Sequence, residues 1–187
     1  MLRRASFLLV LISGLTSVAA MASDLSDLGP AIGSKIPHDL TAPDQEGVEQ
    51  SFNTLTGEKG AVLVFFRSAK WCPFCQKQLI QMQAAQSGIK ARGYKLIAIS
   101  YDTVPQLAQF AGKRKIGYTL LSDQGSRIID AFGIRNDTYA SDHYAYGVPY
   151  PLILVVDSTG LVRAKLWEES YRDRPETVVI LEAIDGL

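Results

Sequence analysis

Two cysteines, Cys72 and Cys75, are the only cysteines in the 187 residues of this chain, and they lie three positions apart. The continuously apolar residues 61–65 precede them, and the residues after them have the apolar spacing of an amphipathic helix. The pair is therefore predicted where a buried strand ends and a helix begins. A thiolate in a first helical turn is stabilised by unpaired backbone N–H groups and the helix dipole, which lower its pKa and make it nucleophilic.

The spacing of the pair suits an intramolecular disulfide. Cys72 is expected at or just before the first turn, as the nucleophile, and Cys75 on the same side of that turn, as the resolving thiol. Pro73 fits an early helical position, which needs no N–H. A zinc site would require two more ligands, but the chain has no third cysteine, and His38 and His143 lack zinc-finger spacing. We therefore expect no metal and no cofactor. A purely structural disulfide is the remaining alternative, although a bridge over so short a loop stabilises little.

Composition and charge indicate one globular domain of ordinary size. Hydrophobic residues make up 47% of the chain and charged residues 20%, which suits a packed core. The formal net charge is zero, so nothing points to nucleic acid as a partner.

The first residues have the pattern of a secretory signal peptide. Arg3 and Arg4 precede an apolar run at 7–15, and Ala20-Met21-Ala22 offers a small-residue cleavage site. We expect residues 1–22 to be removed after Ala22, residues 23–35 to form a linker, and residues 36–187 to form the domain. The apolar run is short for a membrane span, so no stable membrane insertion is expected after cleavage, with an uncleaved anchor as the alternative. The mature protein would be secreted or periplasmic.

Apolar runs and turn signals predict alternating strands and helices. The strand–helix–strand pattern around the cysteines implies a right-handed parallel crossover. A small hairpin is expected at 38–41 and 48–52. Core strands are expected at 61–66, 94–100, 119–122, 152–156 and 161–167, and helices from the cysteines to about residue 90, then near 103–115, 126–132 and 175–184.

The motif Trp71-Cys72-Pro73-Phe74-Cys75 after a hydrophobic strand resembles the active site of the thioredoxin superfamily. The wider stretch 65–79 is similar to redoxin domains of the alkyl hydroperoxide reductase/thiol-specific antioxidant family, and this resemblance extends over about residues 30–170. It implies an α/β thioredoxin-like fold, with a central mixed β-sheet flanked by helices and an N-terminal redoxin-type β-hairpin extension.

The resemblance also implies a cis-proline loop that faces the sulfurs. Pro151 occupies the matching position when counted back from the turn at 157–160, and Pro149 is the alternative. A cis X–Pro bond costs only about 0.5–1 kcal/mol relative to trans. The backbone of Tyr150 would then be free to pair with an extended substrate.

Two activities use the same pair of sulfurs. The first is thiol–disulfide exchange with protein or small-molecule thiols and disulfides, including a redox partner protein; the second, kept as the alternative, is an antioxidant, peroxiredoxin-like reduction of hydroperoxides. Exchange is preferred because the resemblance to peroxiredoxins is incomplete. If Cys75 is aligned with their peroxidatic cysteine, Cys72 replaces the usual Thr and Pro151 replaces an Arg that polarises the peroxide. Arg67 is an alternative source of a guanidinium.

The remaining site expectations concern the surroundings of the pair. Lys70 is a candidate for lowering the pKa of Cys72, and Trp71 for covering one side of the site. Phe66 stands where thioredoxins have a buried Asp. The aromatic-rich loop 134–150 is interpreted either as a binding surface or as core packing. A copper metallochaperone that uses both thiols and His143 is a further alternative. The sequence specifies neither the partner, nor the direction of electron flow, nor the oligomeric state.

Overall fold

A computed structural model of the protein describes residues 28–168 and 170–187. The predicted signal peptide and the first part of the predicted linker, residues 23–27, lie outside the described residues. Within the described residues, no helix is both long and apolar enough to cross a membrane.

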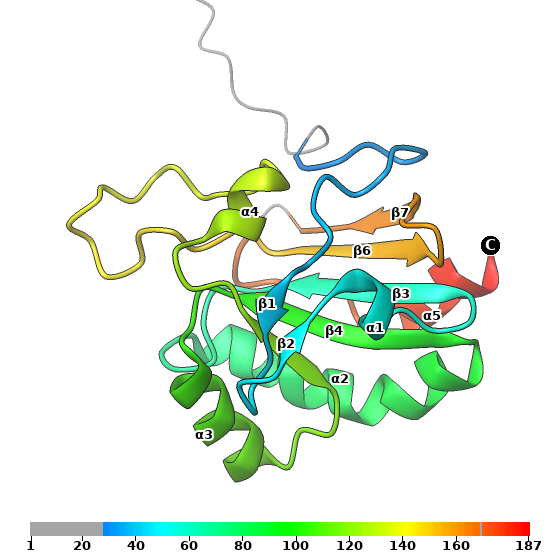
Figure 1. Ribbon diagram of the computed structural model, residues 1–187, viewed down its shortest axis with the longest axis horizontal. Coiled ribbons are helices and arrows are strands. Elements are labelled where there is room, and N and C mark those ends of the chain that lie inside the picture. Colours follow the sequence, from blue (N-terminus) through cyan, green and yellow to red (C-terminus); the bar gives the residue numbers. More distant parts are fainter. Residues whose placement is uncertain (1–27, 169) are drawn as a thin grey trace, which may run out of the picture.

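A five-stranded mixed sheet in the order β5-β4-β3-β6-β7 forms the centre of the molecule (Figure 1). Its first three strands along the chain are parallel: β3 (Gly60–Phe65), β4 (Tyr94–Ser100) and β5 (Thr119–Ser122). The last two return antiparallel: β6 (Leu152–Asp157) beside β3, and β7 (Val162–Leu166) beside β6. Because β3 lies in the middle, the segment that follows it emerges at the centre of one edge of the sheet.

The sheet is buried on both faces, which explains its continuously apolar strands. Along β3, Val62 and Val64 point to one core while Ala61 and Leu63 point to the other. The first core is shared with α2 (Pro73–Ala91), α3 (Val104–Arg114) and α5 (Thr177–Asp185). The second is shared with α1 (Phe52–Leu55), α4 (Arg127–Ala131) and the segment that leads into the hairpin of β1 (Ala42–Pro43) and β2 (Glu49–Gln50). The predicted thioredoxin-like architecture is confirmed.

Most predicted elements are confirmed with small shifts at their ends, but the first hairpin strand, predicted at 38–41, is wrong because that strand is found at Ala42–Pro43. The strand at 94–100 is confirmed over its whole length and Gly93, at φ +84°, follows the end of α2 as predicted. The hairpin begins later than predicted, because Leu40 adopts a left-handed φ of +58°, which no strand accommodates. The last helix begins at Thr177, two residues after the predicted start.

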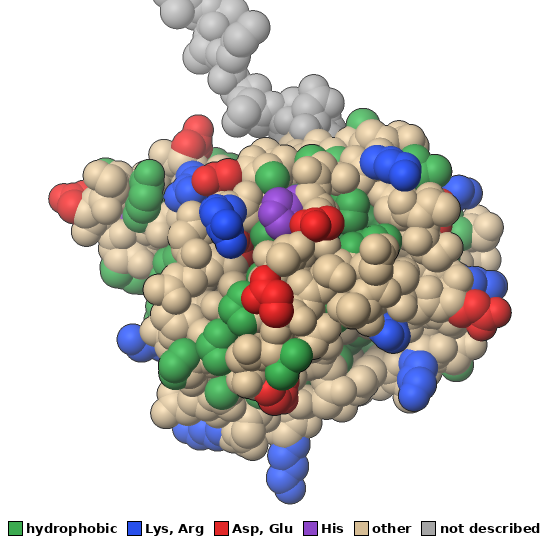
Figure 2. Space-filling model, in the orientation of Figure 1, with side chains coloured by type: hydrophobic (Ala, Val, Ile, Leu, Met, Phe, Trp, Pro, Cys, Tyr) green, Lys and Arg blue, Asp and Glu red, His purple; other side chains and the backbone are tan. Residues whose placement is uncertain are grey.

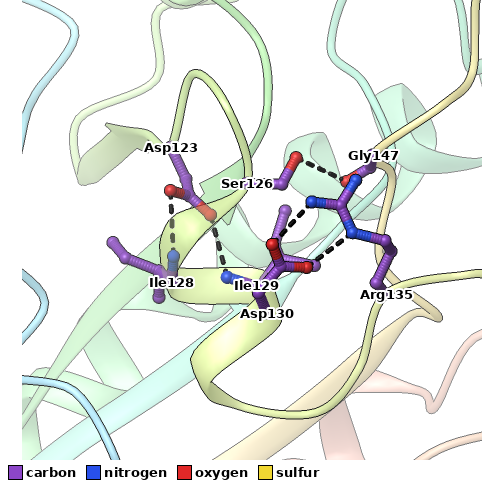
Figure 3. A network of polar contacts seen from close by, with 7 residues as sticks. All are labelled: Asp123, Ser126, Ile128, Ile129, Asp130, Arg135 and Gly147. Atoms are coloured by element: carbon purple, nitrogen blue, oxygen red, sulfur yellow. Dashed lines mark hydrogen bonds and ion pairs between the residues drawn. The ribbon is translucent and has the colours of Figure 1, made fainter. Parts of the chain in front are cut away.

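The long connection between α4 and β6 is tied to α4 by side-chain contacts (Figure 3). Arg135 forms a bidentate ion pair with Asp130, at 2.5 and 2.6 Å. The hydroxyl of Ser126 donates to the carbonyl of Gly147 at 2.8 Å, and Gly147 has a φ of +95°, which favours glycine. The carboxylate of Asp123 accepts the N–H groups of Ile128 and Ile129 in the first turn of α4. These contacts fix both ends of a loop that carries aromatic residues to the cysteines.

Acidic and basic side chains are interspersed on the face of the molecule seen in Figure 2. This pattern agrees with the zero formal net charge of the chain.

Candidate active site

The two cysteines occupy the junction of β3 and α2, as predicted. Cys72 is the N-cap residue of α2, Pro73 is its first helical residue, and the N–H of Cys75 donates to the sulfur of Cys72 at 3.2 Å. The sulfurs form a disulfide, with the two Cα atoms 5.3 Å apart. The exposed fraction is 2% for Cys72 and 0% for Cys75, so both are almost completely covered.

The loop that precedes the cysteines, residues 67–71, is held by a buried carboxylate at the end of β4; we call it the Ser68 loop. Asp102 accepts hydrogen bonds from the hydroxyl of Ser68 at 2.7 Å and from the N–H of Ala69 at 2.6 Å. Ser100 donates a third at 3.1 Å. Burial raises the pKa of Asp102, and these hydrogen bonds oppose the rise. The sequence suggested Asp102 or Thr103 as the cap of the next helix; Thr103 has that position, and Asp102 anchors the active-site loop instead.

Trp71 packs against the core cluster that includes both cysteines and is fixed by a chain of hydrogen bonds. Its indole N–H donates to the hydroxyl of Tyr101 at 2.9 Å, and that hydroxyl donates to the carbonyl of Tyr144 at 2.9 Å. The rings of Trp71 and Tyr144 meet edge to face at 5.1 Å. Tyr144 is itself 68% exposed. The aromatic loop therefore packs against Trp71, while the side chain of Tyr144 stays exposed to solvent, and the binding-surface interpretation stays a prediction.

Arg67 is buried in a cage of aromatic rings. Its guanidinium carbon lies 5.0 Å from the ring centre of Trp71, 5.3 Å from that of Tyr139 and 4.6 Å from that of Tyr171. It donates to the hydroxyl of Tyr139 at 2.7 Å. Its Nε has no hydrogen-bond partner among the described residues. The contacts of Arg67 are thus with the rings around the site, whereas the cation in contact with sulfur is a different arginine.

That cation is Arg174, in the segment 170–176 before α5, which we call the Arg174 loop. Its Nη2 lies 3.6 Å from the sulfur of Cys75, and its Nε donates to Oε1 of Gln78 at 3.0 Å. Its Nη1 donates to the carbonyls of Tyr171 and Asp173. Burial, and then the charge of Arg67, lower the pKa of Arg174 to about 10, so the guanidinium stays charged near neutral pH. Sequence reasoning missed Arg174 and Gln78, because no motif connects them to the cysteines.

The proline prediction is wrong. The described chain contains no cis peptide bond, so Pro149 and Pro151 both follow trans bonds, the form that X–Pro bonds ordinarily prefer. The N–H of Tyr150 donates to the carbonyl of Ile134 at 2.8 Å and is not free for a substrate. Pro151 does lie at the predicted edge of the sheet, because the next residue, Leu152, pairs with the last residue of β3.

The other side chains that the sequence predicted around the pair are Phe74, Lys70 and His143. Phe74 is 37% exposed and meets the ring of Tyr171 edge to face at 6.2 Å. Lys70 is exposed, and its N–H donates to the hydroxyl of Ser68. His143 stacks on Tyr139 and its Nδ1 accepts the N–H of Ala145. No group of three or more potential metal ligands occurs in the described part of the chain.

Comparison with known proteins gives the family of this chain. The model of the AhpC/TSA family matches residues 32–165, so the chain belongs to the AhpC/TSA family. Among similar proteins, a chloroplastic peroxiredoxin Q of Sedum lineare is 30% identical over 127 residues, which are 68% of this chain and 64% of that protein. The peroxiredoxin Bcp of Escherichia coli K12 is 28% identical over 107 residues, 57% of this chain and 67% of that protein. The chain thus spans less than two thirds of the Sedum lineare protein.

Solved structures of peroxiredoxins share the fold. The peroxidoxin BcpB of Mycobacterium tuberculosis superposes with a TM-score of 0.70 at 23% identity, covering 83% of this chain and 97% of that one. The peroxiredoxin 6 of Arenicola marina superposes with a TM-score of 0.73 at 18% identity, covering 84% and 73%. At these identities the likeness shows the fold alone, and it agrees with the sheet and helices described above.

Proposed function

We propose that this protein is a thiol-dependent peroxidase that reduces hydroperoxides with the Cys72–Cys75 pair. The observation that carries the proposal is the cysteine pair at the N-terminus of α2 in a chain of the AhpC/TSA family. The names of the similar proteins, peroxiredoxin Q and peroxiredoxin Bcp, support the same reaction. Placing the peroxidase reaction first reverses the sequence-based prediction, which preferred thiol–disulfide exchange.

The pair supplies all the groups that such a cycle needs except the reductant. One thiolate attacks an oxygen of the hydroperoxide, a sulfur–oxygen bond forms, the oxygen–oxygen bond breaks, and the alkoxide leaves and takes up a proton. The other thiol attacks the resulting sulfenic acid and releases water, which leaves a disulfide. An external dithiol, of protein or small-molecule origin, then returns two electrons and two protons. The net reaction converts the hydroperoxide to an alcohol and water.

Burial of the sulfurs favours a small oxidant. Exposed fractions of 2% and 0% leave little sulfur surface for a folded protein disulfide to approach. A hydroperoxide group is only two oxygen atoms long and needs far less access. Disulfide exchange remains part of the proposed cycle, as the step in which a dithiol reduces the Cys72–Cys75 bridge.

A single-turnover comparison tests the proposal. The reduced protein is mixed with hydrogen peroxide, with an organic hydroperoxide, or with glutathione disulfide, and oxidation is followed by fluorescence. The chain has two tryptophans, so Trp167→Phe isolates the signal of Trp71 beside the pair. We expect oxidation by a hydroperoxide to be at least a hundredfold faster than for a free cysteine. Rapid oxidation by the disulfide alone would instead identify an exchange enzyme.

We further propose that the protein is exported. Arg3 and Arg4, the apolar run at 7–15 and the small residues before position 23 support this. N-terminal sequencing of the protein expressed from its full chain tests it, with a start at Ser23 expected. A protein that retains Met1 and stays inside the cell would contradict export and leave the proposed reaction untouched.

A further inference from the structure

Arg174 contacts the sulfur of Cys75 and Arg67 lies near Arg174, and neither arginine has a carboxylate partner among the described residues. The ion pairs of the described residues involve other arginines, namely Arg92, Arg135 and Arg163. Arg67 is 4% exposed and Arg174 is half-buried. A cation taken out of water is costly unless an anion compensates it, and a second nearby cation adds to that cost. The site therefore favours an anion next to these two guanidiniums.

The hydrogen bonds of Arg174 determine which of the two sulfurs is placed to be that anion. Arg174 is held through Nε by Gln78, which lies one helical turn after Cys75 on α2, and through Nη1 by the carbonyls of Tyr171 and Asp173. These bonds aim the remaining nitrogen, Nη2, at the sulfur of Cys75 at 3.6 Å. Among the described residues, the sulfur of Cys72 accepts one hydrogen bond, from the backbone N–H of Cys75. A full charge stabilises a thiolate more strongly than one amide dipole does.

We propose that Arg174 is a catalytic residue that holds Cys75 as a thiolate, and that Cys75, rather than Cys72, is the sulfur that attacks the hydroperoxide. The peroxide step of this proposal rests on the proposed function, whereas the stabilised thiolate does not. Cys72 then becomes the resolving thiol, which reverses the roles expected from the resemblance to thioredoxins. The guanidinium comes from the Arg174 loop and so supplies the charge that Pro151 cannot.

The reaction follows with these roles. The Cys75 thiolate attacks the terminal oxygen of the hydroperoxide, the oxygen–oxygen bond breaks, and the leaving alkoxide is protonated by solvent. The sulfenic acid on Cys75 lies one turn from Cys72, whose Cα is 5.3 Å away. The Cys72 sulfur attacks it, water leaves, and the disulfide of the structure results. Reduction by an external dithiol restores both thiols.

The pH dependence of alkylation tests the stabilised thiolate without peroxide. Cys72→Ser leaves Cys75 as the single thiol, and serine is itself a favoured N-cap residue, so the start of α2 is kept. In this background Arg174→Gln is expected to raise the midpoint of iodoacetamide alkylation by at least one pH unit, a tenfold loss of thiolate near neutral pH. Arg174→Lys keeps the charge but not the planar contacts, so its alkylation midpoint is expected to lie between those of Cys72→Ser alone and of Arg174→Gln in the same background.

Arg172→Gln is the matched control. Arg172 lies in the same loop, is exposed, and contacts Tyr171 through its Nε at 3.4 Å. Its removal is expected to move the midpoint by less than about 0.3 pH units, which is well under the shift expected for Arg174→Gln. Equal midpoints for Arg174→Gln and Arg172→Gln would overturn the role of Arg174. If Arg174→Gln does not fold, as judged by circular dichroism, the neutral variant Arg174→Met takes its place, and a midpoint equal to that of Arg172→Gln would overturn the role as well.

Labelling of sulfenic acid with dimedone tests which sulfur attacks. After one equivalent of hydroperoxide, we expect label on Cys75 in Cys72→Ser and at least a hundredfold less on Cys72 in Cys75→Ser. Label on Cys72 alone would restore the roles expected from the sequence. If neither variant nor the wild type reacts faster than a free thiol, the peroxidase function fails, while the alkylation midpoints still decide whether Arg174 stabilises the thiolate.

Discussion

Two walls border the cysteine site, the Ser68 loop as the first and the Arg174 loop as the second, and they are held in place in different ways. The Ser68 loop follows β3 directly and is anchored by two hydrogen bonds to Asp102, just after the end of the neighbouring parallel strand. The Arg174 loop comes from the far end of the chain and meets α2 through the side chains of Arg174 and Tyr171. The first wall therefore contributes mainly to the stability of the fold, and the second mainly to the chemistry of the sulfur. Substitutions in the two walls should separate these effects.

The largest effect on stability is expected in the first wall. Asp102→Ala leaves the hydroxyl of Ser68 and the N–H of Ala69 without their buried acceptor, at a cost of about 3 kcal/mol in the free energy of unfolding. Urea unfolding measures this loss. Asp102→Asn, which keeps one acceptor oxygen, is expected to lose less. A loss below about 1 kcal/mol for Asp102→Ala would mean that the loop has another anchor.

The same carboxyl gives a pH dependence with a defined sign. Burial raises the pKa of Asp102 above its ordinary value of 3.8, so the folded protein binds this proton more tightly than the unfolded chain does. Stability from this group is therefore present at low pH and is lost as the pH rises from about 4 through the raised pKa. Asp102→Asn removes this dependence. We expect the stability of the wild type to fall with rising pH relative to Asp102→Asn, in urea titrations between pH 4 and 7.5.

A smaller effect, on redox equilibrium, is expected in the second wall. Arg174 stabilises the reduced state if it stabilises the Cys75 thiolate, because the disulfide carries no charge. Arg174→Gln should then make the pair harder to reduce and lower its reduction potential by about 30 mV for each tenfold change in equilibrium constant. Arg67→Gln should change the potential less, since the contacts of Arg67 are with aromatic rings. Equilibration with glutathione buffers compares the two variants, and a larger shift for Arg67→Gln would reverse their assignment.

The smallest effect is expected where the aromatic loop meets the site. Tyr101→Phe removes the acceptor of the Trp71 indole N–H and the donor to the carbonyl of Tyr144. Both groups are partly exposed and can bind water instead, so the cost should be about 1 kcal/mol. Thermal unfolding measures the cost, and the fluorescence of Trp71 should report greater mobility of the indole. An unchanged emission would show that ring packing alone holds Trp71.

The sequence predicted what is local or periodic, and missed what distant segments bring together. The strand at 94–100 and the helix after Cys72 could be predicted because their signals are local. These signals are the spacing of apolar residues within each element and the glycine at position 93, just after the helix. Asp102 looked like a helix cap, because its real partners, Ser68 and Ala69, lie more than thirty positions away. Arg174 stands in a polar stretch with no motif, and only the packing of α5 against α2 brings it to Cys75. The cis-proline failed because an analogy of position does not determine the isomer.

The disulfide lies inside an intact first turn of α2, and this has a consequence for turnover. The carbonyl of Cys72 still accepts the N–H of Gln76 at 3.0 Å while the two sulfurs are joined. Closing the bridge therefore does not require the loss of this backbone hydrogen bond, and we expect the oxidised and reduced proteins to share one helix start. In the proposed cycle no local unfolding separates peroxide reduction from disulfide formation. The slowest step is then expected to be the approach of the reducing dithiol to a sulfur that is almost completely buried.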